Sequence, residues 1–224
     1  MTDFNVFSAF LIGIAGGVHC VGMCGGIATA FGATIPSHHP KNAYIALYNL
    51  GRILSYTVAG GITGFLGSVV SLSLRNGLVY LSIVSGIILL LLACYLGNWW
   101  RILTAIEALG SRVWKRIQPL SKRFLPVDSY GKALGYGMIW GWLPCGLVYS
   151  TLTWSMASGD ALNGAAIMLA FGLGTLPTLF AASLSAQWLV KGFRHPVVKQ
   201  CIATLVAIYA VFLIYNGYNS IYNA

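Results

Sequence analysis

Two short segments of this chain combine cysteine with residues that interrupt helices. Residues 17–26 read GVHCVGMCGG, and residues 140–146 read WGWLPCG. Thiols exchange disulfides, and thiolate, thioether and imidazole groups bind soft metal ions. Both segments lie within long apolar stretches, where reactive groups and helix-breaking residues are costly and usually mark a functional path. We therefore look for the function at Cys20, Cys24 and Cys145.

The composition predicts an all-α integral membrane protein. Of the 224 residues, 58% are hydrophobic and 8% are charged, which leaves too little polar surface for a soluble globule. Runs of about 20 apolar residues, the length that spans a bilayer as a helix, occur six times. They cover residues 4–33, 44–73, 78–98, 132–157, 161–188 and 198–222.

The basic residues predict the orientation of these spans. Twelve of the 13 lysines and arginines lie in or next to alternate loops, and Arg75 lies on the opposite side. Because basic loops stay in the cytoplasm, both termini are expected outside, in the periplasm. The net charge of +9 therefore reports topology and contact with membrane lipid rather than binding of nucleic acid. The twelve are Lys41, Arg52, Arg101, Arg112, Lys115, Arg116, Lys122, Arg123, Lys132, Lys191, Arg194 and Lys199.

A basic segment, residues 100–131, divides the single membrane domain into residues 1–99 and 132–224, each with three predicted spans. We expect this segment to lie at the cytoplasmic membrane surface. The two halves resemble each other. A shift of 125 residues places Ile14, Gly16 and Cys20 on Ile139, Gly141 and Cys145, and a shift of 123 places Leu50-Gly51 on Leu173-Gly174. Since three is an odd number of spans, the halves are predicted to form an inverted repeat.

The repeat places a site near the middle of the membrane. Cys20 and Cys145 each lie about halfway along a span, where inverted repeats bring discontinuous helices together. Pro144 and nearby glycines such as Gly22 favour breaks in both helices. A helix that begins at such a break directs free N–H groups toward it, and this positive end favours a thiolate.

Four features together resemble the DsbD/CcdA membrane superfamily. They are the cysteines of the first and fourth spans, WLPCG at 142–146, NLGR at 49–52 and FGLGTLP at 171–177. The segment around Cys20 is similar to the His-Cys-x-Gly-Met-Cys-Gly branch, whose members are labelled cytochrome c biogenesis transmembrane region, urease-accessory-like or sulfite exporter.

The resemblance implies transmembrane thiol–disulfide exchange in the bacterial inner membrane. Reducing equivalents would pass from a cytoplasmic thioredoxin-like donor to a periplasmic thioredoxin-like acceptor, in support of cytochrome and oxidase assembly, and no cofactor would be required. It implies that Cys145, between Pro144 and Gly146, is one redox cysteine. The repeat alignment favours Cys20 as the other, and whether Cys20 or Cys24 pairs with Cys145 stays open. Cys24 is a further thiol that simpler members lack. The supporting residues implied by the motifs are Gly22, Asn49, Arg52, Pro144, Gly146 and Pro177.

The segment around Cys20 also supports a second hypothesis for the function. His19, Cys20, Met23 and Cys24 have helical spacings that place Cys20 near Met23 and Cys24. Thiolate and thioether ligands select Cu(I), so the path could carry copper or another soft metal to a metallochaperone for metalloenzyme assembly. The cluster has no Asp or Glu, which excludes Mg²⁺ and Ca²⁺. Whether the chain is an enzyme stays open at this point, because an electron transporter of this kind is at most oxidoreductase-like.

Other notable residues receive simpler interpretations. Arg52 is expected to extend its charged group to the lipid phosphates, as basic side chains near span ends do. The alternative is that it lines the cavity and raises the positive potential near a thiolate. Tyr48, Tyr56 and Trp142 are expected at the interface or in packing. Asp160 is predicted to cap the fifth span. The lone cysteines 94 and 201 are expected to pack as small hydrophobic residues.

The orientation predicted from the charge distribution can be tested with topology reporters. Reporters fused at Ser158 or after Ala224 should be periplasmic, and one at Arg112 should be cytoplasmic, because basic loops are retained inside. Alkaline phosphatase and green fluorescent protein activities of the fusions measure this. A periplasmic Arg112 loop would reverse the orientation.

Overall fold

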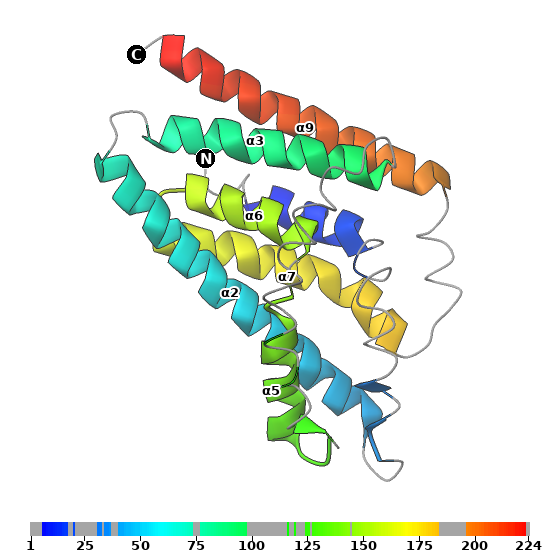
Figure 1. The fold of residues 1–224 in the computed structure, drawn as a ribbon. Coiled ribbons are helices and arrows are strands. Elements are labelled where there is room, and N and C mark those ends of the chain that lie inside the picture. The colour runs from blue at the N-terminus through cyan, green and yellow to red at the C-terminus, as the bar shows by residue number, and fades with distance from the viewer. Residues whose placement is uncertain are drawn as a thin grey trace.

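The computed structural model describes residues 6–17, 20, 31–32, 34–36, 40–73, 77–97, 116, 119, 124–125, 127–143, 145–183 and 196–222. Within these residues the regular structure is helical, as the composition predicted (Figure 1). A helix at Val6–Gly17 comes first. The others are α2 (Lys41–Ser73), α3 (Gly77–Leu96), α5 (Tyr130–Trp140), α6 (Gly146–Ala157), α7 (Ala161–Ser183) and α9 (Pro196–Tyr222).

The length and surface of the helices suit a membrane. Among the described residues, two helical segments are long and apolar enough to cross a bilayer, Lys41–Leu72 and Ala161–Ala181. Val6–Gly17, Val79–Tyr95 and Ala203–Asn219 are shorter apolar helices. Large apolar side chains such as Leu72, Leu162 and Leu205 are more than half exposed. Broad apolar surface of this kind is unfavourable in water and favourable against lipid chains.

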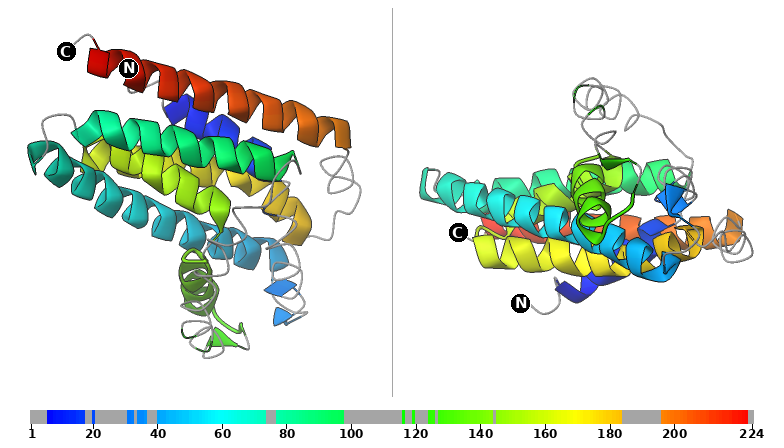
Figure 2. Two further views of the ribbon diagram at one scale, coloured as in Figure 1. Left: turned by 45° about the horizontal axis from the view of Figure 1, so that its top comes forward. Right: turned by 90° about the horizontal axis from the view of Figure 1, so that it is seen from below.

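Two antiparallel helix pairs form most of the molecule. α2 packs along α7, and α3 packs along α9, with α6 in contact with α2, α3 and α7. Figures 1 and 2 show the α3–α9 pair as an outer layer beside α6. α5 packs against the first half of α2 and runs at a steep angle to α6. The α2 helix thus contacts both α5 and α7 along its length.

Glycines allow the paired helices to approach closely. A Cβ on Gly60 of α2 would collide with the backbone oxygen of Gly164 in α7, and Gly164 has the reciprocal contact with Gly60. In the other pair, a Cβ on Gly86 of α3 would lie 3.1 Å from the backbone oxygen of Ala210 in α9. Small residues at such contacts let membrane helices gain dispersion energy where the hydrophobic effect contributes little.

The predicted fourth span, residues 132–157, is not one helix. α5 ends at Trp140, Gly141 is its C-cap, and α6 begins at Gly146 after Cys145. The predicted break in this span is therefore confirmed. Pro144, to which the sequence analysis attributed the break, lies outside the described residues. Of the predicted first span, the structure describes residues 6–17, residue 20 and residues 31–32.

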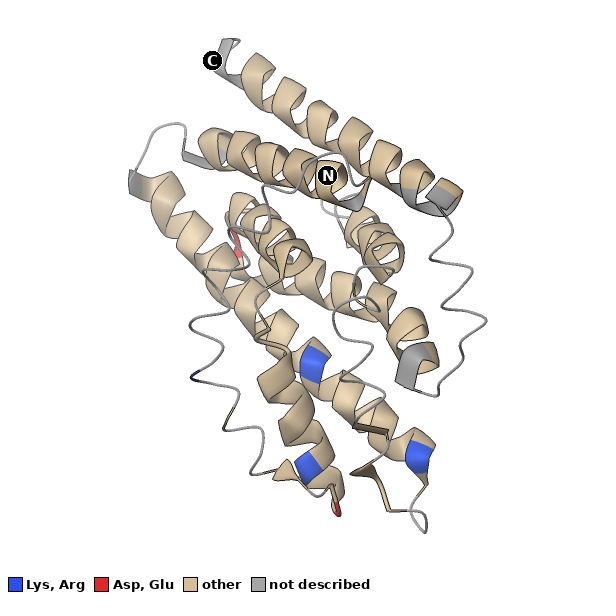
Figure 3. Cartoon of the chain, turned by 45° about the vertical axis from the view of Figure 1, so that its right-hand side comes forward, with Lys and Arg blue, Asp and Glu red and all other residues tan. Residues whose placement is uncertain are grey.

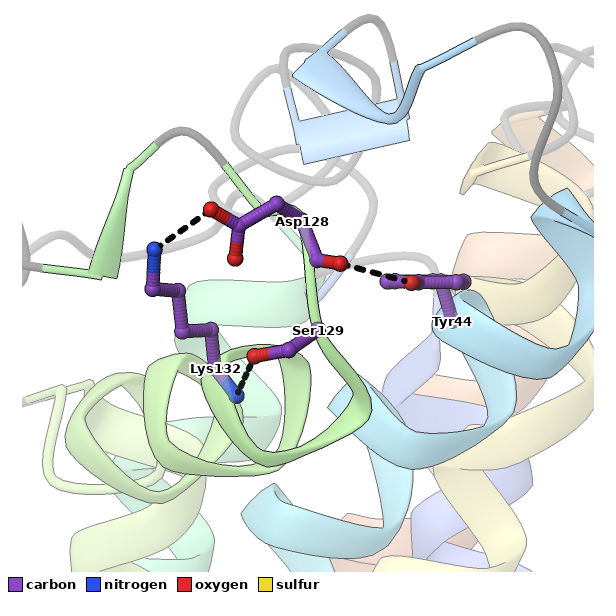
Figure 4. Close-up of polar contacts among 4 residues, drawn as sticks. All are labelled: Tyr44, Asp128, Ser129 and Lys132. Atoms are coloured by element: carbon purple, nitrogen blue, oxygen red, sulfur yellow. Dashed lines mark hydrogen bonds and ion pairs between the residues drawn. The ribbon is translucent and has the colours of Figure 1, made fainter.

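A polar cap fixes the start of α5 to the start of α2 (Figure 4). The Tyr44 hydroxyl donates to the backbone oxygen of Asp128 at 3.3 Å, and the Ser129 side chain accepts from the Lys132 N–H at 3.4 Å. The Lys132 ammonium donates to the Asp128 carboxylate at 2.8 Å, and this hydrogen bond holds the pKa of Asp128 below its usual value. Because the ion pair is exposed, it orients the chain more than it stabilises the fold.

A second cap confirms the prediction for Asp160. Its carboxylate accepts a hydrogen bond from the Asn163 N–H at 2.8 Å, as an N-cap does. The preceding Gly159 has a φ of 63°, a conformation that glycine adopts without steric cost. The turn from α6 to α7 is therefore tight, and it places α7 beside α2.

The close approach of α2 to α7 can be tested with two neighbouring glycines. Gly60→Ala should destabilise the protein by about 1–3 kcal/mol, because the new methyl group meets the backbone of α7. Gly61→Ala is the matched control, since its nearest neighbours lie 3.7 Å or more away, and its effect should stay within about 0.5 kcal/mol. Thermal unfolding in detergent micelles measures both. Equal effects of the two substitutions would contradict this packing.

Candidate redox site

Cys145 lies directly before the first residue of α6, at the end of the break. It is the N-cap residue, with an extended backbone at φ −125° and ψ 149°, and its side chain is buried. The first N–H groups of a helix have no intrahelical acceptor, so the partial positive charge of the α6 N-terminus lies at this residue. That placement favours the thiolate over the thiol, and the thiolate is the reactive form in disulfide exchange.

Cys20 is helical and follows Gly17, the last residue of the described helical segment Val6–Gly17, by three positions. That segment packs against α6 and α7. A Cβ on Gly16 would collide with the side chain of Leu147 in α6, and a Cβ on Gly17 would collide with that of Thr178 in α7. Gly16 and Gly17 therefore lie between the start of α6 and the C-terminal part of α7. Cys20 itself is buried.

Both cysteines belong to one core cluster of buried side chains. Cys20 and Cys145 are each 6% exposed, and the cluster also contains Leu147, Phe171 and Leu179. This largely apolar setting limits access of water to either sulfur. The structure thus brings two of the three predicted redox cysteines into the same core, from opposite halves of the chain.

Arg52 does not extend to the lipid phosphates, so that prediction is wrong. Its side chain is 2% exposed. The guanidinium donates to the Tyr56 hydroxyl at 2.7 Å and to the Asn49 side-chain oxygen at 3.4 Å. It also lies over the rings of Tyr48 and Tyr56, at 5.9 and 5.4 Å from their centroids. Polar partners and aromatic faces within the protein therefore solvate the charge that lipid headgroups were expected to solvate.

Two hydroxyl residues that the sequence did not single out, Ser55 and Thr178, lie near the segments that carry Cys145 and Cys20. The Ser55 hydroxyl donates to the backbone oxygen of Met138 at 2.8 Å, in the last turn of α5, and Ser55 also contacts Gly141. Thr178 of α7 contacts Gly17, three residues before Cys20. The signal for Ser55 was its position one helical turn after Arg52 on the same face of α2.

The other predicted residues fall into two groups, those outside the described part of the chain and those that the structure places. Five predicted residues lie outside the described part of the chain: His19, Gly22, Met23, Cys24 and Pro144. The structure therefore does not test whether the proposed metal ligands lie together. Across the described part of the chain, no group of three or more His, Cys, Asp or Glu side chains could hold a metal ion.

The remaining residues are placed by the structure. Gly146 is the first residue of α6, and Asn49 is buried beside Arg52. Pro177 lies inside α7 next to Thr178, where it removes one backbone donor. Trp142 is 52% exposed, which fits an interfacial aromatic, whereas Tyr48 and Tyr56 are buried in packing. The lone cysteines at 94 and 201 lie on α3 and α9, outside the core cluster that contains Cys20 and Cys145.

Comparison with protein families identifies the class. Residues 8–212 match the cytochrome c biogenesis protein transmembrane region, a DsbD-type family. Because the match covers most of the chain, the protein belongs to this family of membrane proteins, and membership implies thiol–disulfide transport. Neither the curated proteins nor the solved structures gave a match.

The shared core of the two cysteines leads to a disulfide prediction. Mild oxidation of the purified protein should link Cys20 or Cys24 to Cys145, which requires the bonded pair to bring their Cα atoms within about 7 Å. Peptide mass spectrometry without reduction measures the linkage. The cysteines at 94 and 201 serve as internal controls and should stay unlinked to Cys145. Oxidation that never yields a linkage to Cys145 would contradict the site.

Proposed function

We propose that the protein passes reducing equivalents from the cytoplasm to the periplasm by thiol–disulfide exchange at Cys20 and Cys145. The observation that carries this proposal is the burial of both cysteines in one core, with Cys145 at the start of α6. Family membership supports the same chemistry. The extra thiol, Cys24, could replace Cys20 as the partner of Cys145, and the disulfide experiment separates the two.

The exchange moves two electrons in two steps. A thiolate of a cytoplasmic thioredoxin-like donor attacks one sulfur of the membrane disulfide, and the S–S bond breaks so that its electron pair stays on the other cysteine. The second donor thiol then displaces the first membrane cysteine, leaving the donor oxidised and the membrane pair as a dithiol. At the periplasmic face the same steps run in reverse on a thioredoxin-like acceptor disulfide, in support of cytochrome or oxidase assembly.

We also propose that the two halves form an inverted repeat. Matched contacts support this. Gly51 of α2 lies against Leu134 and Met138 of α5, and Gly174 of α7 lies against Phe10 and Gly13 of the first helix. The shifts of 123 and 125 residues place Gly51 on Gly174 and Gly13 on Met138.

A second pair of contacts follows the same relation. The shift of 123 places Ser55 on Thr178. Ser55 contacts Gly141, which the shift of 125 matches to Gly16, and Thr178 contacts the next residue, Gly17. Each glycine precedes a redox cysteine by three or four residues. In each half, then, the second long helix packs on the first helix of the other half, close to the cysteine. Such an arrangement would let the site open to either face in turn.

The proposed orientation places the α5 end of the molecule in the cytoplasm and both termini in the periplasm of a bacterial inner membrane. The lysine and arginine segments in Figure 3 support it, because they lie toward the α5 end of the molecule. Basic residues at that end agree with the positive-inside rule.

Copper handling is the second proposal, and it rests on the sequence cluster of His19, Cys20, Met23 and Cys24. Soft sulfur ligands would bind Cu(I) as cargo for a metallochaperone. The redox proposal has the additional support of the core that Cys20 and Cys145 share.

Two substitutions that preserve size separate the functions. Cys145→Ser should abolish electron transfer, because serine cannot form the mixed disulfide. Met23→Leu keeps the apolar bulk and removes the thioether, so it should change electron transfer less than about twofold. Transfer to a periplasmic thioredoxin-like acceptor in reconstituted vesicles measures both.

If the protein handles copper, Met23→Leu should lose Cu(I) uptake into the same vesicles, and Cys145→Ser should keep it. Loss of Cu(I) uptake in Met23→Leu together with full function of Cys145→Ser would overturn the redox proposal. Wild-type protein with both activities absent would overturn both proposals.

A further inference from the structure

The redox chemistry proposed above leaves one buried charge without a role. Arg52 is 2% exposed and lies in the interior of a protein with few charges. A charge in an interior of low dielectric acts over a longer range than a surface charge, because water and salt screen it less. Its position relative to the cysteines therefore matters.

Arg52 lies beside the break that leads to Cys145. Its backbone oxygen is 3.1 Å from the point that a Cβ on Gly141 would occupy, and Gly141 precedes Cys145 by four residues. The next helical turn of α2 carries Ser55, which binds the last turn of α5. This part of α2 thus packs against the C-terminal end of α5.

Tyr56 holds the Arg52 guanidinium on the side of the cysteine core. The hydrogen bond from the guanidinium to the Tyr56 hydroxyl is 2.7 Å long, and the same ring contributes a cation–π contact. Tyr56 belongs to the core cluster that contains Cys20 and Cys145, and its ring packs against Phe171. The charge is therefore fixed at the edge of that cluster.

The second half of the chain has no cation at the matching position. The shift of 123 residues places Arg52 on Thr175 of α7, whose hydroxyl donates to the backbone oxygen of Gly172 in its own helix. The break before Cys145 therefore has a fixed positive charge beside it. The matching position of α7 has a neutral hydroxyl instead, and α7 is the helix that packs on Gly13 and Gly17 before Cys20. The electrostatic environments of the two halves differ although their backbones correspond.

We propose that Arg52, fixed by Tyr56, is a positioning residue that stabilises negative charge on the sulfur of Cys145. The proposal rests on the redox function of the Cys20–Cys145 pair. When a donor thiolate attacks Cys20, the S–S bond breaks and its electron pair leaves on Cys145. Arg52 and the N-terminus of α6 both stabilise this leaving thiolate, and a better stabilised thiolate leaves faster.

The test uses a protein in which Cys145 is the single cysteine, with Cys20, Cys24, Cys94 and Cys201 replaced by serine. Iodoacetamide, which is small and uncharged, reports the reactivity of Cys145 at pH 7 in detergent micelles. Arg52→Gln should slow alkylation about fivefold to tenfold, as expected for the loss of one poorly screened charge. Arg52→Lys keeps the charge and should restore at least half of the wild-type rate.

Two further variants keep the test decisive. Tyr56→Phe removes the hydroxyl that accepts from the guanidinium, so the charge is less firmly fixed, and alkylation should slow about twofold to threefold. This variant decides the question if Arg52→Gln fails to fold. Thr175→Val is the matched control, because it removes a buried polar group at the corresponding position of α7 without changing charge, and it should leave the rate unchanged. A wild-type rate in folded Arg52→Gln, equal rates in the Lys and Gln variants, or a wild-type rate in Tyr56→Phe would overturn the proposal.

The redox equilibrium of the Cys20–Cys145 pair with glutathione gives a second measurement. Arg52→Gln should shift it about fivefold to tenfold toward the disulfide, since the dithiol state loses its stabilised thiolate. The alkylation assay needs no disulfide and no partner protein. A charge effect on Cys145 without any Cys20–Cys145 disulfide would therefore overturn the redox function, whereas a functional disulfide that is insensitive to Arg52 would overturn the role of Arg52.

Discussion

The break between α5 and α6 is the constraint on which the rest of the structure depends. In lipid, every backbone N–H and C=O must find a partner within the protein, so a helix can stop inside a membrane protein only where neighbouring groups satisfy its end. Here the Ser55 hydroxyl binds the Met138 carbonyl in the last turn of α5, and the Gly141 N–H bonds to Gly137 and Ile139. The break is thereby tolerated, and it places Cys145 at the start of α6.

The α2 helix meets this constraint and also organises the core. Its first half contacts α5 through Gly51 and Ser55, and its second half contacts α7 through Gly60 and Gly64. Glycine at the contacts brings the backbones together, which keeps the Ser55 hydroxyl within reach of α5. Arg52 and Tyr56 lie in the same part of α2 as Ser55, and they join the aromatic cluster around Tyr48 to the cluster that contains the cysteines. The same helix therefore closes the break and places a charge next to it.

This arrangement fits a membrane thiol site in physical terms. An isolated cysteine in an apolar interior stays protonated and unreactive, because burial disfavours the thiolate. A helix N-terminus and a buried cation oppose that effect at Cys145. The faces of the Tyr48 and Tyr56 rings stabilise the guanidinium of Arg52 in this interior. The chemistry of the site is thus supplied by the surroundings of the cysteine as much as by the thiol.

The sequence by itself determined the class of protein and the positions of its reactive residues. Composition required helices in a membrane, the family motifs indicated thiol exchange, and glycine and proline near Cys145 indicated a broken helix, because each of these signals depends on local residue chemistry. The Asp160 cap was also predictable, since a cap involves residues three apart.

The tertiary structure alone decided the fate of Arg52 and the roles of Ser55 and Thr178. A basic residue near the end of a span has the same local pattern whether it reaches lipid or folds inward, and the outcome depends on whether α5 and α7 cover that face of α2. Likewise, Ser55 gained its role only because Met138, 83 residues later, ends a helix beside it. Contacts between residues so far apart in the chain leave no periodic signal in the sequence, so only the packed helices reveal them.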